Sequence, residues 1–311
     1  MKCVVTGAAG FIGSHLCEHL LGLGHEVHGL DAFIPYYSPE IKQQNLETAR
    51  QSPAFHFHEL DLRTDSVTDV IRGADVVYHL AAMPGLTRSW HDFDLYESCN
   101  VTATQRLLEA LRHGAPRPPR LVHASTSSAY GLNARGSESE PTHPISPYGI
   151  TKLAAENLVQ AYATAYQIPA VILRYFSVYG PRQRPDMGYH QFVRALLKDE
   201  PITVFGDGKQ VRGNTYVSDC VRATVLAANA PVGSVYNVGG GEPASVWDIL
   251  DILQQLAGRS AKILREPARA GDQGFTLADT TRIARDLGWR PQIPLRDGLT
   301  RQWEWQKSQT R

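Results

Sequence analysis

Short runs of apolar, often β-branched residues alternate with longer segments of helical periodicity through the first 175 residues. The predicted strands cover residues 2–6, 26–30, 55–60, 75–80, 120–124 and 170–175. The predicted helices between them cover residues 13–23, 94–113 and 146–166. Strands that alternate with helices imply right-handed crossovers and a parallel sheet. The first 175 residues are therefore expected to form a doubly wound α/β domain.

The pattern becomes less regular after residue 176. A Pro- and Arg-rich loop covers residues 180–187, and clear helical periodicity returns over residues 245–257, 280–287 and 295–306. We predict that residues 176–311 form mainly a smaller α/β lobe. Some segments after residue 210 are expected to return to the first domain, residues 1–175.

Charge and hydropathy narrow the range of partners. Lys plus Arg equals Asp plus Glu at 31 each, so no overall field attracts nucleic acid or an anionic membrane. The apolar run that begins at Cys3 leaves no room for a leader, and no apolar stretch could span a bilayer. The sequence predicts a cytoplasmic protein.

The cysteines and histidines show no spacing typical of metal ligands. The four cysteines are far apart and are expected to be reduced thiols. His15, His19 and His25 lie on or after the first predicted helix, while His56 and His58 alternate along a strand. Without a carboxylate partner to complete a ligand set, the sequence predicts no metal site.

Three glycines follow the first strand at intervals of three residues: Gly7, Gly10 and Gly13. Such a turn allows close approach of a pyrophosphate to a helix N-terminus. Asp31 ends the second strand, where a carboxylate can accept both adenosine ribose hydroxyls and repel a 2′-phosphate. The combination favours NAD over NADP; the plainer alternative is a structural turn with Asp31 in a solvated loop.

Tyr148 and Lys152 begin a predicted helix, and their four-residue offset puts both on one face. A lysine and a nicotinamide cation nearby would lower the pKa of the phenol, so Tyr148 can act as a base. Tyr-x-x-x-Lys is often only an exposed pair. The hydroxyl-rich segment 125–131 ends the fifth strand, however, and carboxyl ends of parallel strands share one crevice.

Together these motifs resemble the extended short-chain dehydrogenase/reductases and, within them, the nucleotide-sugar epimerases and dehydratases. The resemblance implies a Rossmann fold, tightly bound NAD and a role in carbohydrate metabolism. The matching pieces are residues 6–13, 61–62, 79–82, 100, 125–131, 148–152, 174–182, 206–219 and 269–272. The implied cofactor-binding residues are Gly7, Gly10, Phe11, Ile12, Gly13, Asp31, Asp61, Leu62, Leu80, Ala81, Ala82, Asn100, Tyr148, Lys152 and Tyr175.

The resemblance also implies a mechanism. Tyr148 would be the catalytic base, Lys152 its electrostatic partner and a ligand of the nicotinamide ribose, and Thr126 the hydroxyl bonded to the sugar O4. Oxidation at C4 gives a 4-keto sugar, and an epimerase returns the hydride to its opposite face. A dinucleotide sensor that does no chemistry is an alternative, but it need not retain all three residues.

The substrate is expected to be a nucleotide sugar. By resemblance, Arg212 and Arg269 would bind the pyrophosphate and Asp272 the ribose, although each arginine alone could be a surface charge. Uracil is the expected base, with thymine as an alternative. The implied substrate-binding residues are Pro84, Gly85, Thr126, Ser127, Ser128, Tyr148, Ser177, Arg184, Thr203, Phe205, Arg212, Arg269 and Asp272.

Similarity is greatest to bacterial UDP-glucuronate 4-epimerases, through residues 124–128 and 180–187. Ser127 and Ser128 stand where 4,6-dehydratases have Asp-Glu, which disfavours dehydration. Ser177 and Arg184 are expected to hold a C6 carboxylate so that the β-keto acid intermediate keeps its carbon dioxide.

The alternatives within the class are a UDP-glucose/UDP-galactose 4-epimerase, in which Arg184 only braces its loop, and a UDP-glucuronate decarboxylase. The resemblance also implies a homodimer that pairs the helices over residues 94–113 and 146–166 as a four-helix bundle.

Overall fold

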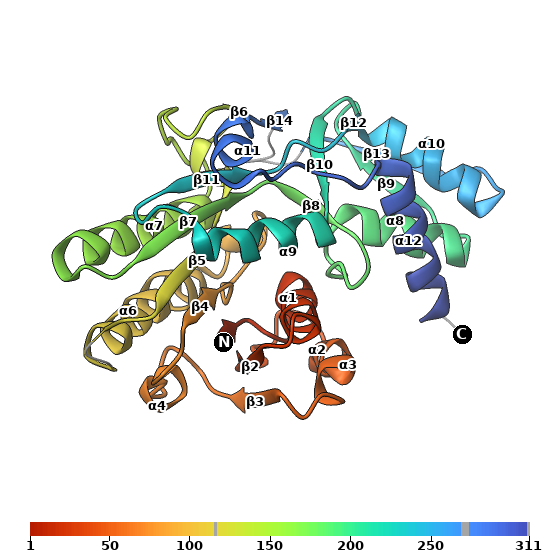
Figure 1. Ribbon diagram of the computed structural model, residues 1–311. Coiled ribbons are helices and arrows are strands. Elements are labelled where there is room, and N and C mark those ends of the chain that lie inside the picture. Colours follow the sequence, from red (N-terminus) through yellow and green to blue (C-terminus); the bar gives the residue numbers. More distant parts are fainter. Residues whose placement is uncertain (115–116, 269–273, 310–311) are drawn as a thin grey trace.

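A seven-stranded sheet organises the computed structural model, which describes residues 1–114, 117–268 and 274–309 (Figure 1). The strand order is β11-β7-β5-β4-β1-β2-β3, and every neighbouring pair is parallel. The predicted doubly wound parallel sheet is confirmed. Its strands are β1 (Lys2–Thr6), β2 (Glu26–Asp31), β3 (Phe55–Glu59), β4 (Val76–His79), β5 (Arg120–Thr126), β7 (Ala170–Tyr175) and β11 (Val235–Val238).

Helices cover both faces of this sheet because alternate strand residues point to opposite sides. Val5 packs in one apolar cluster with Leu16, whereas its neighbour Val4 packs in another with Leu107 and Val159. The helices are α1 (Phe11–Gly22), α2 (Pro39–Asn45), α3 (Glu47–Arg50), α4 (Thr68–Ile71), α5 (Phe93–Glu97), α6 (Ala103–Gly114), α7 (Pro147–Tyr166), α8 (Gly188–Lys198), α9 (Val217–Leu226), α10 (Val246–Ala257), α11 (Thr281–Leu287) and α12 (Leu295–Ser308).

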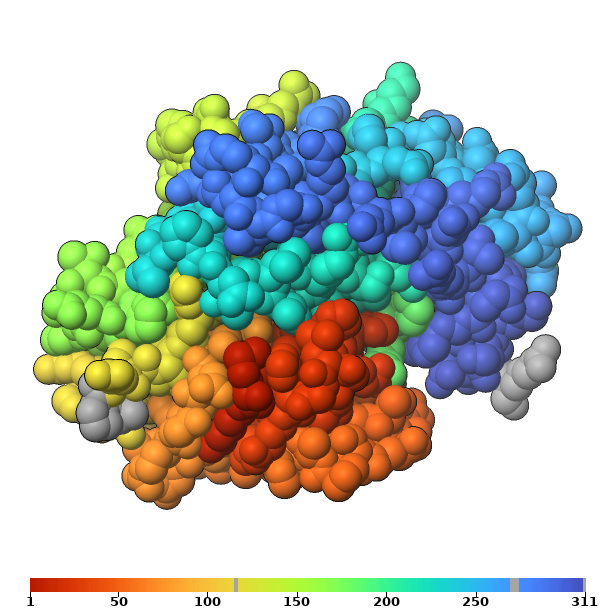
Figure 2. Space-filling model, viewed as in Figure 1, coloured from red at the N-terminus to blue at the C-terminus, as the bar shows by residue number. Residues whose placement is uncertain are grey.

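Two smaller sheets form beside the large one. The first has the order β12-β10-β14-β6 with β8 also paired to β10, and the second pairs β13 with β9. Figure 2 shows the C-terminal segments, in blue, gathered above the N-terminal ones, in red and orange. The strands are β6 (Asn133–Gly136), β8 (Ser177–Tyr179), β9 (Ile202–Phe205), β10 (Val211–Tyr216), β12 (Pro243–Ser245), β13 (Ile263–Glu266) and β14 (Phe275–Ala278).

The predicted helix over residues 94–113 contains an irregularity. Between α5 and α6 the chain forms a π-helical segment, η2 (Ser98–Thr102). Three 3₁₀ turns complete the described elements: η1 (Arg88–Trp90), η3 (Ser127–Tyr130) and η4 (Ala227–Asn229). None of the helices in the described ranges is both long and apolar enough to cross a membrane.

Candidate active site

A cavity lies along the carboxyl ends of β1, β2, β4, β5 and β7. All but one of the predicted cofactor residues line it. These are Gly7, Gly10, Phe11, Ile12, Gly13, Asp31, Asp61, Leu62, Leu80, Ala81, Ala82, Tyr148, Lys152 and Tyr175. Of the predicted substrate residues, Pro84, Tyr148 and Arg184 line the same cavity. The motifs that lie between residues 6 and 184 thus meet at one place.

The turn after β1 has room only for glycine at two of its positions. Gly7 has a φ of +72°, and a Cβ there would lie 2.8 Å from the Ala81 nitrogen. A Cβ on Gly13 would lie 2.0 Å from the Gly7 carbonyl oxygen. Helix α1 therefore begins directly against the turn, with its first N–H groups close to the cavity wall. This cradle fits a dinucleotide pyrophosphate.

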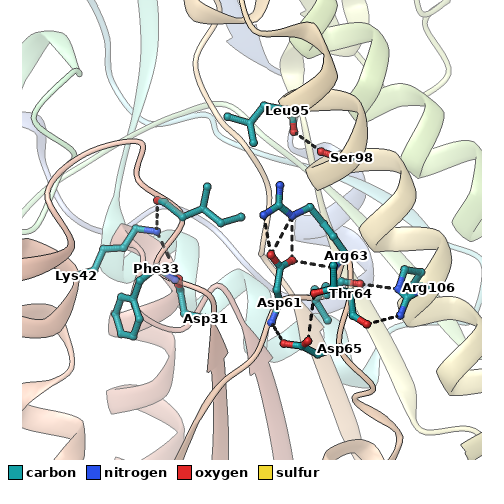
Figure 3. Close-up of polar contacts among 12 residues, drawn as sticks. Asp31, Phe33, Lys42, Asp61, Arg63, Thr64, Asp65, Leu95, Ser98 and Arg106 are labelled. Atoms are coloured by element: carbon teal, nitrogen blue, oxygen red, sulfur yellow. Dashed lines mark hydrogen bonds and ion pairs between the residues drawn. The ribbon is translucent and has the colours of Figure 1, made fainter.

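Asp31 is held in a fixed orientation at the end of β2. Its carboxylate accepts hydrogen bonds from the backbone nitrogens of Ala9, at 3.2 Å, and Phe33, at 2.9 Å. The Lys42 ammonium lies 3.4 Å from the same carboxylate and also donates to the Ile34 carbonyl at 3.3 Å (Figure 3). A carboxylate oriented in this way fits the hydroxyls of an adenosine ribose.

Asp61 is paired with Arg63 at another part of the cavity wall. Arg63 Nη2 lies 2.7 Å from Oδ2 and Nε lies 3.0 Å from Oδ1 (Figure 3). These hydrogen bonds hold the pKa of Asp61 below its ordinary value. Arg106 of α6 donates to the Leu62 and Thr64 carbonyls, which fixes the loop after β3.

Tyr148 stands in the first turn of α7. The Ser146 side chain caps this helix by accepting from the Gly149 nitrogen at 3.1 Å, and Pro147 occupies the first helical position. Burial raises the pKa of the Tyr148 phenol, while a hydrogen bond with Thr126 and the charge of Arg184 act in the opposite direction. The sequence predicted a lowered pKa for this phenol, but in the protein alone the pKa is raised. The cost of desolvating the phenolate outweighs the hydrogen bond with Thr126 and the charge of Arg184.

Lys152 follows Tyr148 by one helical turn. It is 3% exposed, and its ammonium donates to the Ala124 carbonyl oxygen at 2.6 Å. Burial lowers its pKa to about 8 from 10.5, partly offset by the charge of Glu156. The Ser125 hydroxyl also lines the cavity, but it donates to Glu156 at 2.7 Å. Thr126, which contacts Tyr148, is thus the hydroxyl that the structure brings to the phenol.

Arg184 and Asp186 form an ion pair beside the cavity, on the loop after β8. The Tyr36 hydroxyl donates to the same Asp186 carboxylate at 3.2 Å, and its ring lies 5.7 Å from the Arg184 guanidinium. Gly85 packs against Tyr36, since a Cβ there would lie 2.3 Å from the phenolic oxygen. Aromatic, charged and glycine residues from three loops therefore meet at this end of the cavity.

Asn100 is the predicted cofactor residue that does not line the cavity. Its side chain is 1% exposed and bonds to the Met83 nitrogen at 2.7 Å and the Thr151 hydroxyl at 3.0 Å. These bonds tie the π-helical segment to the loop after β4 and to α7. The structure therefore gives Asn100 a bracing contact behind the cavity wall.

The other predicted substrate residues lie elsewhere. Ser127 and Ser128 are in η3, Ser177 in β8, Thr203 and Phe205 in β9, and Arg212 in β10. Like Thr126 and Gly85, these residues do not line the cavity formed by the described part of the chain. Arg269 and Asp272 fall outside the described residues.

The cavity residues that the sequence analysis missed include Tyr36, Tyr37, Lys42 and Arg63. The first three come from the segment between β2 and α3, which carries no motif. A signal did exist for Arg63, since it follows the Asp61-Leu62 pair by one position.

The expectation that the histidines lack a carboxylate partner is wrong. The pairing of β2 with β3 places Glu26 beside both His28 and His56. Sequence spacing could not reveal this, because the ligand atoms come from two strands separated by some thirty residues.

Residues 3–239 match the model of a family described as NAD dependent epimerase/dehydratase. YtcB of Bacillus subtilis (strain 168), named as an uncharacterized UDP-glucose epimerase, is 43% identical over 305 residues, 96% of either chain. The UDP-glucuronate 4-epimerase of Thermodesulfobacterium geofontis (strain OPF15) is 36% identical over 316 residues, 98% of this chain and 95% of its own.

A solved structure is similar over the whole fold. The crystal structure of UDP-glucuronic acid 4-epimerase from Bacillus cereus, in complex with UDP-glucuronic acid and NAD, has a TM-score of 0.96 and 42% sequence identity. The match covers 99% of this chain and all of that one.

Proposed function

The chain belongs to the NAD-dependent epimerase/dehydratase family, and we propose that it interconverts UDP-glucuronate and UDP-galacturonate as a 4-epimerase. One observation carries the proposal. The Tyr148 phenol, bonded to Thr126 and within the field of Arg184, stands in the cavity that also contains the glycine turn and Asp31.

The cofactor is NAD, as in the related structures. The glycine turn and the N-terminus of α1 would hold its pyrophosphate, and Asp31 its adenosine ribose. When bound, NAD supplies the acceptor and donor of the C4 hydride. By excluding a 2′-phosphate, the carboxylate of Asp31 favours NAD over NADP.

Tyr148 removes the proton of the C4 hydroxyl in this proposal, while Thr126 fixes the sugar O4 by a hydrogen bond. The buried phenol has a raised pKa, so its deprotonation needs positive charge nearby. Lys152 supplies that charge one helical turn away, and its own low pKa keeps it close to titration. Returning the proton to O4 after the sugar has turned over completes the epimerisation.

Specificity for a sugar with a C6 carboxylate depends on Arg184 in this proposal. Its guanidinium lines the cavity near Tyr148, and we assign it to the C6 carboxylate together with Ser177, Ser127 and Ser128. Fixed contacts would keep the bond to the carboxyl carbon out of line with the C4 ketone, which prevents loss of carbon dioxide. In the wider lobe, Thr203, Phe205 and Arg212 are assigned to the uridine diphosphate, as are Arg269 and Asp272.

A UDP-glucose/UDP-galactose 4-epimerase is the second candidate. The 43% identity to a protein named as an uncharacterized UDP-glucose epimerase favours it, as does the pairing of Arg184 with Asp186 inside the protein. In that case the arginine would brace its loop and leave a neutral C6 uncontacted.

The two candidates are separated by the sugars that the purified enzyme turns over. The protein is incubated with UDP-glucuronate or UDP-glucose, and the products are resolved by chromatography and identified by mass and retention. We expect kcat/KM for UDP-glucuronate to exceed that for UDP-glucose at least tenfold, with UDP-galacturonate as product. The reverse order of the two sugars, or chiefly a UDP-pentose product, would overturn the proposal.

We also propose a homodimer through α5, η2, α6 and α7. Phe93, Ile150 and Tyr166 are exposed apolar side chains on these helices or next to them. Light scattering during size-exclusion chromatography tests this assembly.

The division into an NAD domain, residues 1–175, and a nucleotide-sugar lobe stays a prediction. The cytoplasmic location also stays a prediction.

A further inference from the structure

Strands β2 and β3 lie at one edge of the large sheet (Figure 1). Three histidines and a glutamate share one face of this pair, and none of the four lines the cavity. His28 is the register partner of His56, and Leu30 that of His58. Because alternate strand residues point to the same side, Glu26 and His28 of β2 lie on one side of the sheet with His56 and His58 of β3. The active site uses none of these four side chains.

The spacing of the polar atoms matches that of metal ligands. Glu26 Oε1 lies 2.9 Å from His28 Nε2 and 3.5 Å from His56 Nε2, and one ligand atom from each residue falls within 4.8 Å of the others. Two bonds of roughly 2.1 Å at a tetrahedral angle separate their donor atoms by about 3.4 Å. Small movements of the half-exposed Glu26 would therefore admit an ion between the three residues.

His58 can orient the imidazole of His28, the residue at the centre of the group. His28 Nδ1 lies 3.0 Å from His58 Nε2, and the two rings are nearly parallel, with an interplanar angle of 11°. In the structure the Glu26 carboxylate accepts a hydrogen bond from His28 Nε2 at 2.9 Å, so a metal ion would replace that proton. With the proton on Nδ1 and donated to His58, the lone pair of Nε2 points toward Glu26 and His56. An outer hydrogen bond of this kind fixes the tautomer of metal-binding histidines.

We propose that Glu26, His28 and His56 form a binding site for a divalent transition-metal ion, with Zn²⁺ as the preferred occupant. Two imidazoles and one carboxylate suit zinc and disfavour Mg²⁺ and Ca²⁺, which prefer oxygen ligands. Three protein ligands leave a fourth position for water.

A metal ion bound to these residues would add a link between β2 and the edge strand β3. Asp31, the proposed adenosine-ribose ligand, lies on the same strand three residues after His28. An ion at this position would thus stabilise the strand that carries part of the cofactor site, without touching the reacting atoms. The expected consequence is a stability effect of zinc on the folded protein.

The test uses untagged, chelator-treated protein and isothermal titration with ZnCl₂. We expect one ion per chain with a dissociation constant in the micromolar range or below, and a higher thermal unfolding midpoint at saturation. His56→Ala and Glu26→Gln should each weaken binding at least tenfold. Both side chains are about half exposed, at 46% and 51%, so these variants should fold.

His113→Ala is the matched control. His113 is 64% exposed and lies 3.2 Å from Glu109, so it represents a histidine–carboxylate pair without a second histidine in the group. It should leave zinc binding unchanged, whereas His58→Ala should weaken it about 10- to 100-fold at the same stoichiometry. The proposal is overturned if the wild type binds no zinc, or if His56→Ala and Glu26→Gln retain the wild-type affinity.

Discussion

Arg184 and Asp186 are joined by two parallel hydrogen bonds, with Nε 3.0 Å from Oδ1 and Nη2 2.9 Å from Oδ2. Burial would raise the pKa of Asp186, but the charge of Arg184 and its hydrogen bonds hold it below the ordinary value. The guanidinium therefore reaches the cavity wall with its charge already balanced. A substrate carboxylate must share or displace this internal partner, which makes the pair the clearest point at which uronic acids and neutral sugars would differ.

Replacing the Arg184 guanidinium should weaken the binding of UDP-glucuronate more than that of UDP-glucose. In Arg184→Gln, KM for UDP-glucuronate should rise about 10- to 100-fold, because a charged hydrogen bond is worth about 1.5–3 kcal/mol. Turnover of UDP-glucose should change less than threefold, and the UDP-pentose formed by decarboxylation should increase. Steady-state kinetics with product analysis measures all three quantities.

Arg182→Gln is the control for that substitution, since Arg182 pairs with Glu18 at 2.7 Å and does not line the cavity. It should leave the ratio of the two substrates unchanged. An equal loss on both sugars in Arg184→Gln would show that the arginine only supports its loop.

Removing the phenolic oxygen should stop the chemistry while leaving the cavity intact. In Tyr148→Phe, kcat should fall by about 10²- to 10⁴-fold, the range expected for loss of a general base. NAD content, measured by absorbance after denaturation, should stay at the wild-type level. Tyr166→Phe, at the exposed end of the same helix, should keep full activity; wild-type kcat in Tyr148→Phe would exclude the tyrosine as the base.

The pH profile should reveal the buried lysine. Lys152 has a pKa lowered to about 8, so its positive charge is present below that pH and lost above it. Because this charge favours the Tyr148 phenolate, kcat should decline as the pH rises through about 8. In Lys152→Met, kcat should be low and the decline near pH 8 absent, as measured from pH 6 to 10. An unchanged alkaline limb in this variant would assign the titration to another group.

The sequence predicted those parts of the structure that depend on local chemistry. Strand and helix periodicity identified β1 and α7, and the cap formed by Ser146 and Pro147 fixed where α7 begins. The glycine turn could be located from the sequence because its geometry requires glycine at positions 7 and 13. A Cβ at Gly7 or Gly13 would clash with the backbone. These features are encoded within a few residues of one another.

Features that depend on register or on loop conformation could not be predicted. The Glu26–His28–His56 group arises from strand pairing, and the balancing of Arg184 by Asp186 depends on how one loop folds back. The raised pKa of Tyr148 reflects burial, which no spacing of residues encodes. Tyr36 joins this region only because Gly85 allows its phenol to approach.

Two buried histidines should make the protein sensitive to acid. His79 bonds to Thr6 at 2.8 Å and Thr104 at 3.0 Å, and its ring lies 5.3 Å from that of His123. Burial and the charge of Lys152 lower the pKa of His79 to about 3 and that of His123 well below its ordinary value. In the unfolded chain both would take up a proton near pH 6.5.

The sign of the pH effect follows from proton uptake. Between about pH 6.5 and 3 the unfolded state binds more protons than the folded state, so the free energy of unfolding falls as the pH falls. Each histidine contributes about 1.4 kcal/mol per pH unit in this window. Neither ring nitrogen of His123 has a hydrogen-bond partner among the described residues, so an apolar replacement strands no polar group.

His123→Leu should therefore lose less stability on acidification than the wild type. Urea unfolding at pH 7.5, 5.5 and 4.5 should show the variant gaining about 1–3 kcal/mol relative to the wild type between the first and last pH. Groups that titrate alike in both proteins cancel in this difference. The exposed His91 provides the control His91→Leu, which should follow the wild type at every pH. Parallel acid dependence of His123→Leu and the wild type would mean that His123 is protonated in the folded state.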